Sequence, residues 1–89
     1  MKYTVAWLPE AEDHLARLWM AASDRREVTA ATNAIDAQLR SRPLDVGEAS
    51  IGIYRVLVVE PLIVAYKVVE ADRLVSVLSV IRKSYDALP

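Results

Sequence analysis

The sequence contains no cysteine, one histidine and only two glycines. Without cysteine, the chain offers no disulfide, no thiol chemistry and no thiolate ligand for a metal. His14 stands among acidic residues with no second histidine to act beside it, so we expect neither catalysis nor metal binding there. The sequence also has no glycine-rich phosphate loop, no nucleophile triad and no helix dense in basic residues. These absences predict a protein without a cofactor.

A long apolar run is missing as well. No stretch approaches the roughly 20 apolar residues that a membrane-spanning helix needs. The first residues, MKYTVAWLPEAEDH, hold too short an apolar run for a secretory signal, and acidic residues follow at once. We therefore expect a cytoplasmic protein with no membrane partner. The 11 basic and 12 acidic residues leave a net charge of -1, which gives no general attraction to nucleic acid, so any basic site must be local.

The first half of the chain carries the signals of one strand and two helices. Residues 3–8, YTVAWL, are aromatic and β-branched, which predicts a short strand. Pro9 suits the first turn of a helix, and apolar residues then recur every three or four positions. Asp24 and Glu27 match a capping box that starts a second helix, which ends before Pro43. Because the connection between the helices is very short, we expect an antiparallel helical hairpin.

The second half predicts a loop followed by three strands. Residues 43–52 contain proline and both glycines and are expected to form the loop. Three apolar runs, over 53–59, 62–69 and 74–81, are separated by breaks of hairpin length. The 89 residues therefore form one domain, 1–89, of the α+β class with two layers. The expected order is β-α-α-β-β-β, with the helical hairpin on one face of a mainly antiparallel four-stranded sheet.

Three segments in this order resemble the RelE/ParE superfamily of type II toxins, which includes plasmid-stabilisation proteins. They are AEDHLARLW on the first helix, YRVLVVEPLIVAYKV across two strands, and DRLVSVLSVIRK on the last strand. The resemblance covers nearly the whole chain and implies that the first strand lies beside the last. It also implies a cognate antitoxin as partner. Members of the superfamily cut mRNA on the ribosome or inhibit DNA gyrase. The expected target is therefore either the ribosome with its mRNA, or DNA gyrase.

The nucleases of this superfamily use a cluster of basic residues on the open sheet face and a C-terminal tyrosine or histidine, without a metal. Carried over by position, the resemblance implies a catalytic set made of Arg55, Arg82, Lys83 and Tyr85. Leu57 and Ile63 stand where the superfamily usually has basic residues. Whether the chain is a metal-independent endoribonuclease therefore stays open.

Each member of this set also has a structural interpretation. Arg55 can solvate an open sheet face or pair with an acidic residue. Arg82 and Lys83 can protect a strand from edge-to-edge association. Tyr85 can simply pack on the domain.

Strand alternation gives a second hypothesis, about the face of the sheet turned away from the helices. If Tyr54, Val56 and Val58 face the helices, the residues between them face away. The face then displays Leu57, Ile63, Ala65, Lys67, Val77 and Ile81. Such an apolar patch with a charged rim indicates a binding surface, and we expect the antitoxin to cover it, with a second copy of the chain as the next candidate.

Together these patterns predict the toxin of a type II toxin–antitoxin module that blocks translation or DNA gyrase. The alternative is a non-toxic protein-interaction module, or a homodimer, that has the same fold without the activity.

Overall fold

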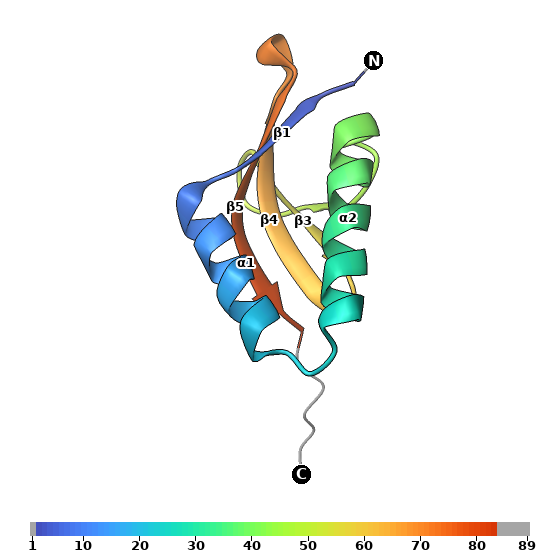
Figure 1. The fold of residues 1–89 in the computed structure, drawn as a ribbon. Helices are drawn as coiled ribbons and strands as arrows, with labels where there is room; N and C mark the ends of the chain where they lie inside the picture. Colours follow the sequence, from blue (N-terminus) through green and yellow to red (C-terminus); the bar gives the residue numbers. More distant parts are fainter. Residues whose placement is uncertain (1, 84–89) are drawn as a thin grey trace.

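The computed structural model of the chain describes residues 2–83, which form two layers, a sheet and a pair of helices (Figure 1). The elements in chain order are β1 (Thr4–Trp7), α1 (Pro9–Ala21), α2 (Arg25–Ser41), β2 (Glu48–Ala49), β3 (Tyr54–Val59), β4 (Leu62–Val69), the short 3-10 helix η1 (Glu70–Asp72) and β5 (Leu74–Arg82). The predicted α+β class is confirmed. The sheet has five strands where four were expected.

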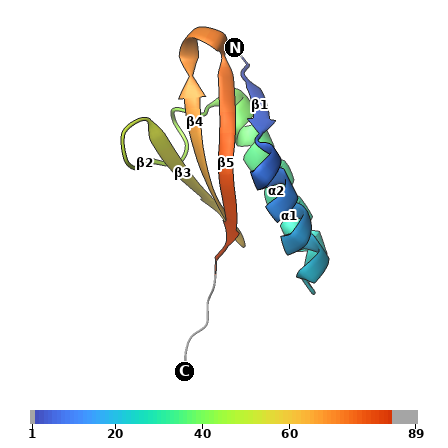
Figure 2. The same ribbon diagram turned by 90° about the vertical axis from the view of Figure 1, so that its left-hand side faces the viewer.

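The strand order is β1-β5-β4-β3-β2. β1 runs parallel to β5, and the other neighbours are antiparallel. The first strand therefore lies beside the last, as predicted. The extra strand is β2, which lies inside the segment that was expected to be a loop. Its two residues pair with Arg55 and Val56 of β3. Figure 2 shows both helices on one side of the sheet.

The two helices begin where the sequence predicts. Pro9 occupies the first turn of α1, where its missing N–H costs no hydrogen bond. Asp24 is the residue before α2, but the predicted capping box is wrong, because the Asp24 side chain makes no cap bond. Its carboxylate instead accepts a hydrogen bond of 2.6 Å from Arg82 at the end of β5. A contact distant in sequence has replaced the local one.

The core lies between the helical layer and the sheet. From α2, the apolar residues that recur every three or four positions are all buried: Val28, Ala31, Ile35 and Leu39. From the sheet, the buried apolar residues are Leu57, Leu62, Val64, Tyr66, Val75, Val77 and Val80. Burial of these side chains is the main favourable term in folding, at about 25 cal/mol per Å² of apolar surface.

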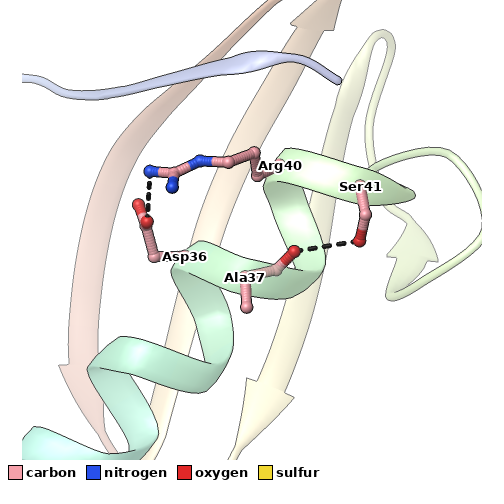
Figure 3. A network of polar contacts seen from close by, with 4 residues as sticks. All are labelled: Asp36, Ala37, Arg40 and Ser41. Atoms are coloured by element: carbon pink, nitrogen blue, oxygen red, sulfur yellow. Dashed lines mark hydrogen bonds and ion pairs between the residues drawn. The ribbon is translucent and has the colours of Figure 1, made fainter. Parts of the chain in front are cut away.

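The last turn of α2 is fastened to the start of the chain. The Tyr3 N–H donates to the Arg40 carbonyl at 2.8 Å, just before β1 begins. On the same turn, Arg40 donates to Asp36 at 2.6 Å and the Ser41 hydroxyl donates to the Ala37 carbonyl at 3.0 Å (Figure 3). The exposed ion pair lies within α2 and contributes less than about 1 kcal/mol. The backbone bond from Tyr3 adds a polar link between the end of α2 and the sheet edge, beside the apolar core.

Candidate functional site

The side chains of β3 that face the helices are the alternate set to the one that the sequence predicted, so the phase of this strand is reversed. Leu57 lies directly opposite Val64 on β4 and is only 6% exposed, so it faces the helices. Its neighbour Val58 is 45% exposed and faces away. The prediction that Leu57 belongs to the open face is therefore wrong. The six residues YRVLVV are nearly all apolar, so their pattern does not fix a phase, and the pairing with β4 decides it.

A β-bulge in β5 reverses the alternation partway along that strand. Ala65 and Tyr66 are adjacent on β4 but pair with Ser79 and Val77, so Leu78 is the extra residue. Before the bulge, Val77 faces the helices and is fully buried. The prediction that Val77 lies on the open face is wrong for this reason. Beyond the bulge, the predicted phase is right, and Ile81 is 52% exposed.

The open face can now be defined from the register of the three strands. Its central residues are Tyr54, Val56, Val58, Ile63, Ala65, Lys67, Ser79 and Ile81. Ile63, Ala65, Lys67 and Ile81 were predicted for it, whereas the three residues of β3 were missed. No element of the described residues 2–83 lies over this face, since both helices cover the other one (Figure 2). Lys67 is the only charged side chain among these eight residues, and Glu48 on β2, opposite Val56, adds an acidic side chain at the edge. The open face is therefore mainly apolar.

Arg55, expected on the open face, points to the inner side with Tyr66, which lies opposite it. Its Nε donates to the Tyr66 hydroxyl at 3.2 Å, and its guanidinium donates to the carbonyls of Leu44 and Val46 at 3.2 and 3.1 Å. The Tyr66 hydroxyl in turn lies 2.8 Å from the Pro43 carbonyl oxygen. Arg55 thus ties the loop after α2 to the sheet.

Arg82 also points toward the helical side. It pairs with Leu62 across the sheet, and its guanidinium donates to Asp24 in the connection between the helices. That hydrogen bond lowers the pKa of the Asp24 carboxyl below its usual value, and it raises the pKa of Arg82. The bridge joins the end of β5 to the helical layer.

The predicted catalytic set is not brought together among the described residues. Arg55 lies opposite Tyr66 and Arg82 lies opposite Leu62. Tyr66 and Leu62 are four residue steps apart on β4, which is about 14 Å along the strand. The two strand spacings from β3 to β5 add about 10 Å across the sheet. Lys83 pairs with Glu60 at 3.1 Å, and Tyr85 lies outside the described residues. The described part of the chain therefore has no cluster of basic side chains on its open face.

Two other kinds of site were sought in the described part of the chain. Residues 2–83 contain no group of three histidine, cysteine or acidic residues placed to hold a metal ion. No helix among them is long and apolar enough to cross a membrane. The open face is consequently the feature that calls for a functional explanation.

Three solved structures are similar to the chain over nearly its whole length. A chain of the toxin–antitoxin complex RelBE2 from Mycobacterium tuberculosis is 20% identical, with a TM-score of 0.77 and 93% of both chains covered. A chain of the chromosomal ParDE toxin–antitoxin system of P. aeruginosa is 15% identical, with a TM-score of 0.69, covering 92% of this chain and 97% of that one. The isolated E. coli RelE toxin is 13% identical, with a TM-score of 0.64, covering 94% and 87%.

The chain has the fold of the RelE and ParE toxins. No protein-family model and no curated protein matches the sequence, so the likeness is one of fold. Within the RelE/ParE fold, the sequence placed the helical hairpin and the strand order correctly. It missed the exposed side chains Tyr54 and Val58, because the other residues of β3 are apolar and its one charged residue, Arg55, was expected to face water.

Proposed function

We propose that the chain is the toxin of a type II toxin–antitoxin module and that a cognate antitoxin covers its open face. The observation that carries the proposal is the RelE/ParE fold combined with an uncovered, mainly apolar sheet face. Val58 and Ile81 are about half exposed on that face, and Tyr54 is 43% exposed. A segment of another chain packed on this face would bury these side chains and remove them from water.

The chemistry of the open face favours a protein target over RNA cleavage. Metal-free cleavage of RNA needs groups that activate the 2′-hydroxyl, stabilise the charged phosphate and protonate the leaving oxygen. Arg55 and Arg82 are far apart and are both engaged in internal bonds. We therefore place inhibition of a protein such as DNA gyrase first, and ribosome-dependent mRNA cleavage second.

Induction of the chain in a bacterial host tests toxicity directly. We expect growth arrest, and we expect it to be relieved by co-expression of a small reading frame that lies next to the gene and encodes the antitoxin. In vitro, inhibition of DNA supercoiling would support the gyrase target, whereas ribosome-dependent mRNA cuts that disappear in Arg82→Ala would support cleavage. Good soluble expression without arrest would contradict toxicity and support the alternative, a non-toxic interaction module.

A pair of variants tests where the antitoxin binds. Val58→Lys places a charge in the open face, and we expect it to weaken antitoxin binding by at least tenfold, because the lysine must be desolvated in the complex. Met20→Lys is the matched control, since Met20 is an apolar side chain exposed to 66% on the helical layer. Binding that is lost in Met20→Lys and retained in Val58→Lys would contradict the proposed face.

A further inference from the structure

The helical layer carries a second apolar surface, a groove between α1 and α2. Its volume is about 440 Å³, and it is lined by Glu12, Leu15, Ala16, Trp19, Met20, Thr29, Thr32 and Asn33. Most of these residues are exposed, and Trp19 and Met20 are exposed to 41% and 66%. Large apolar side chains gathered in one groove on a chain of this size indicate a contact surface.

Trp19 is positioned in this groove by contacts with α2. Its indole N–H donates to the Thr29 hydroxyl at 3.0 Å, across the two helices. The Arg25 guanidinium stacks 4.8 Å from the centre of the indole ring, and it also donates to the carbonyls of Trp19 and Met20. An aromatic side chain that is already fixed loses little conformational entropy on binding, so this one is suited to anchor a partner.

Charges at the ends of the groove have opposite signs. Glu12 lines the end nearest the start of α1. Arg26 lines the hollow that continues past Trp19 toward the start of α2. Other charges nearby are already paired, as Asp36 with Arg40 (Figure 3) and Asp13 with Arg17. Glu12 and Arg26 form no ion pair within residues 2–83.

We propose that this groove binds a second copy of the chain, with the two helical hairpins packed face to face about a two-fold axis. In such an interface every contact occurs twice: a residue i of one copy contacts residue j of the other, and residue j of the first copy contacts residue i of the second. An axis through the middle of the groove brings Glu12 of one copy to Arg26 of the other, and the reverse pair forms at the opposite end. Trp19 and Met20 of both copies then meet near the centre. The surface is thus complementary to itself in charge as well as in apolarity.

The dimensions of the hairpin predict a weak dimer. α1 has 13 residues and α2 has 17, so they are about 20 and 26 Å long. Two helices about 10 Å apart present a footprint of only about 400 Å² per copy, which is below that of a standard stable interface. We therefore expect dissociation in the micromolar range or weaker. The proposal uses the helical face, leaves the open sheet face uncovered, and does not depend on toxicity.

Sedimentation equilibrium of the purified chain, from micromolar to millimolar concentration, measures the association. We expect a monomer–dimer equilibrium that Met20→Glu weakens at least tenfold. The control is Ile81→Glu on the open sheet face, which should leave the equilibrium unchanged. A chain that stays monomeric at every concentration, or a dimer weakened by Ile81→Glu and not by Met20→Glu, would overturn the proposal.

Charge reversal tests the two-fold geometry. Glu12→Arg alone and Arg26→Glu alone should each weaken the dimer about tenfold, because each places like charges together at both ends. Mixing these two variants should give a heterodimer in which all four charges are complementary, and the double variant E12R/R26E should again form a homodimer. Circular dichroism checks that each variant is folded. Single variants that weaken association without recovery in either combination would exclude the proposed packing.

Discussion

Arg55 and Tyr66 lie opposite each other on β3 and β4, and the arginine Nε donates to the tyrosine hydroxyl at 3.2 Å. The same hydroxyl is 2.8 and 2.9 Å from the carbonyl oxygens of Pro43 and Val46. Two side chains on neighbouring strands therefore anchor the loop that follows α2. The arrangement explains how a charged residue is accommodated on the inner side of the sheet.

Tyr66→Phe removes this hydroxyl and with it the buried hydrogen bond to the Pro43 carbonyl, whereas the Val46 carbonyl still accepts from Arg55. We expect the free energy of unfolding to fall by about 1–3 kcal/mol, measured by urea denaturation. Tyr54→Phe, on the open face, is the control and should change it by less than about 0.5 kcal/mol. Equal stability of the two variants would show that the hydroxyl does not hold the loop.

Gly47→Ala tests how closely the same loop approaches β3. Gly47 has φ +69°, and a Cβ placed there would lie 2.6 Å from the Val56 carbonyl oxygen and 2.8 Å from the Tyr66 hydroxyl oxygen. We expect a loss of about 2 kcal/mol or more, from the backbone conformation and the overlap together. Gly52→Ala is a matched control, since Gly52 has φ +61° with nothing within 4 Å, and it should cost only about 1–2 kcal/mol. Thermal unfolding of both variants measures the difference.

Leu57 and Val58 provide a test of the phase of β3. Leu57→Ala should lower the free energy of unfolding by about 2–4 kcal/mol because it opens a cavity in the core. Val58→Ala should have a much smaller effect, because this side chain is 45% exposed. The reverse order of stabilities, measured by chemical denaturation, would restore the phase that the sequence suggested.

The bridge between Asp24 and Arg82 should make stability depend on pH in acid. The hydrogen bond from Arg82 lowers the pKa of Asp24 from its usual 3.8. The folded state therefore holds the Asp24 proton less tightly than the unfolded chain does. The contribution of the bridge is fully present above the unfolded pKa, and it is lost as the pH falls through the lower pKa of the folded state.

A double-mutant cycle measures this contribution. The free energy of unfolding is compared for the wild type, Asp24→Asn, Arg82→Gln and the double variant, at neutral pH and at about pH 3 and below. We expect a coupling energy between the two residues at neutral pH that shrinks in acid. A coupling that is the same at every pH would contradict a role for the Asp24 charge.

The sequence predicted those elements whose signals are local. Pro9 marks the start of α1, and the spacing of Val28 and Ile35 marks the buried side of α2. What it missed depends on contacts between distant segments. The Asp24 side chain binds Arg82 and not its own helix, and the bulge at Leu78 follows from pairing with β4 without a glycine or proline to mark it.

The candidate site was predicted in part for the same reason. Four residues of the open face follow from alternation in β4 and in the end of β5, where the phase was correct. β3 was assigned the wrong phase, since an arginine in a strand is normally expected to face water. Arg55 faces inward because the Tyr66 hydroxyl and the carbonyls of the loop supply its hydrogen bonds.

The parallel pairing of β1 with β5 sets an order of events during synthesis. Thr4 lies beside Leu74, and Trp7 lies beside Val77. β1 thus has no neighbouring strand to pair with until β5 has also been synthesised, and a sheet edge whose two strands are so far apart along the chain closes slowly. A nascent polypeptide that has not yet reached β5 cannot assemble this edge, so the five-stranded sheet is completed only after β5 has left the ribosome.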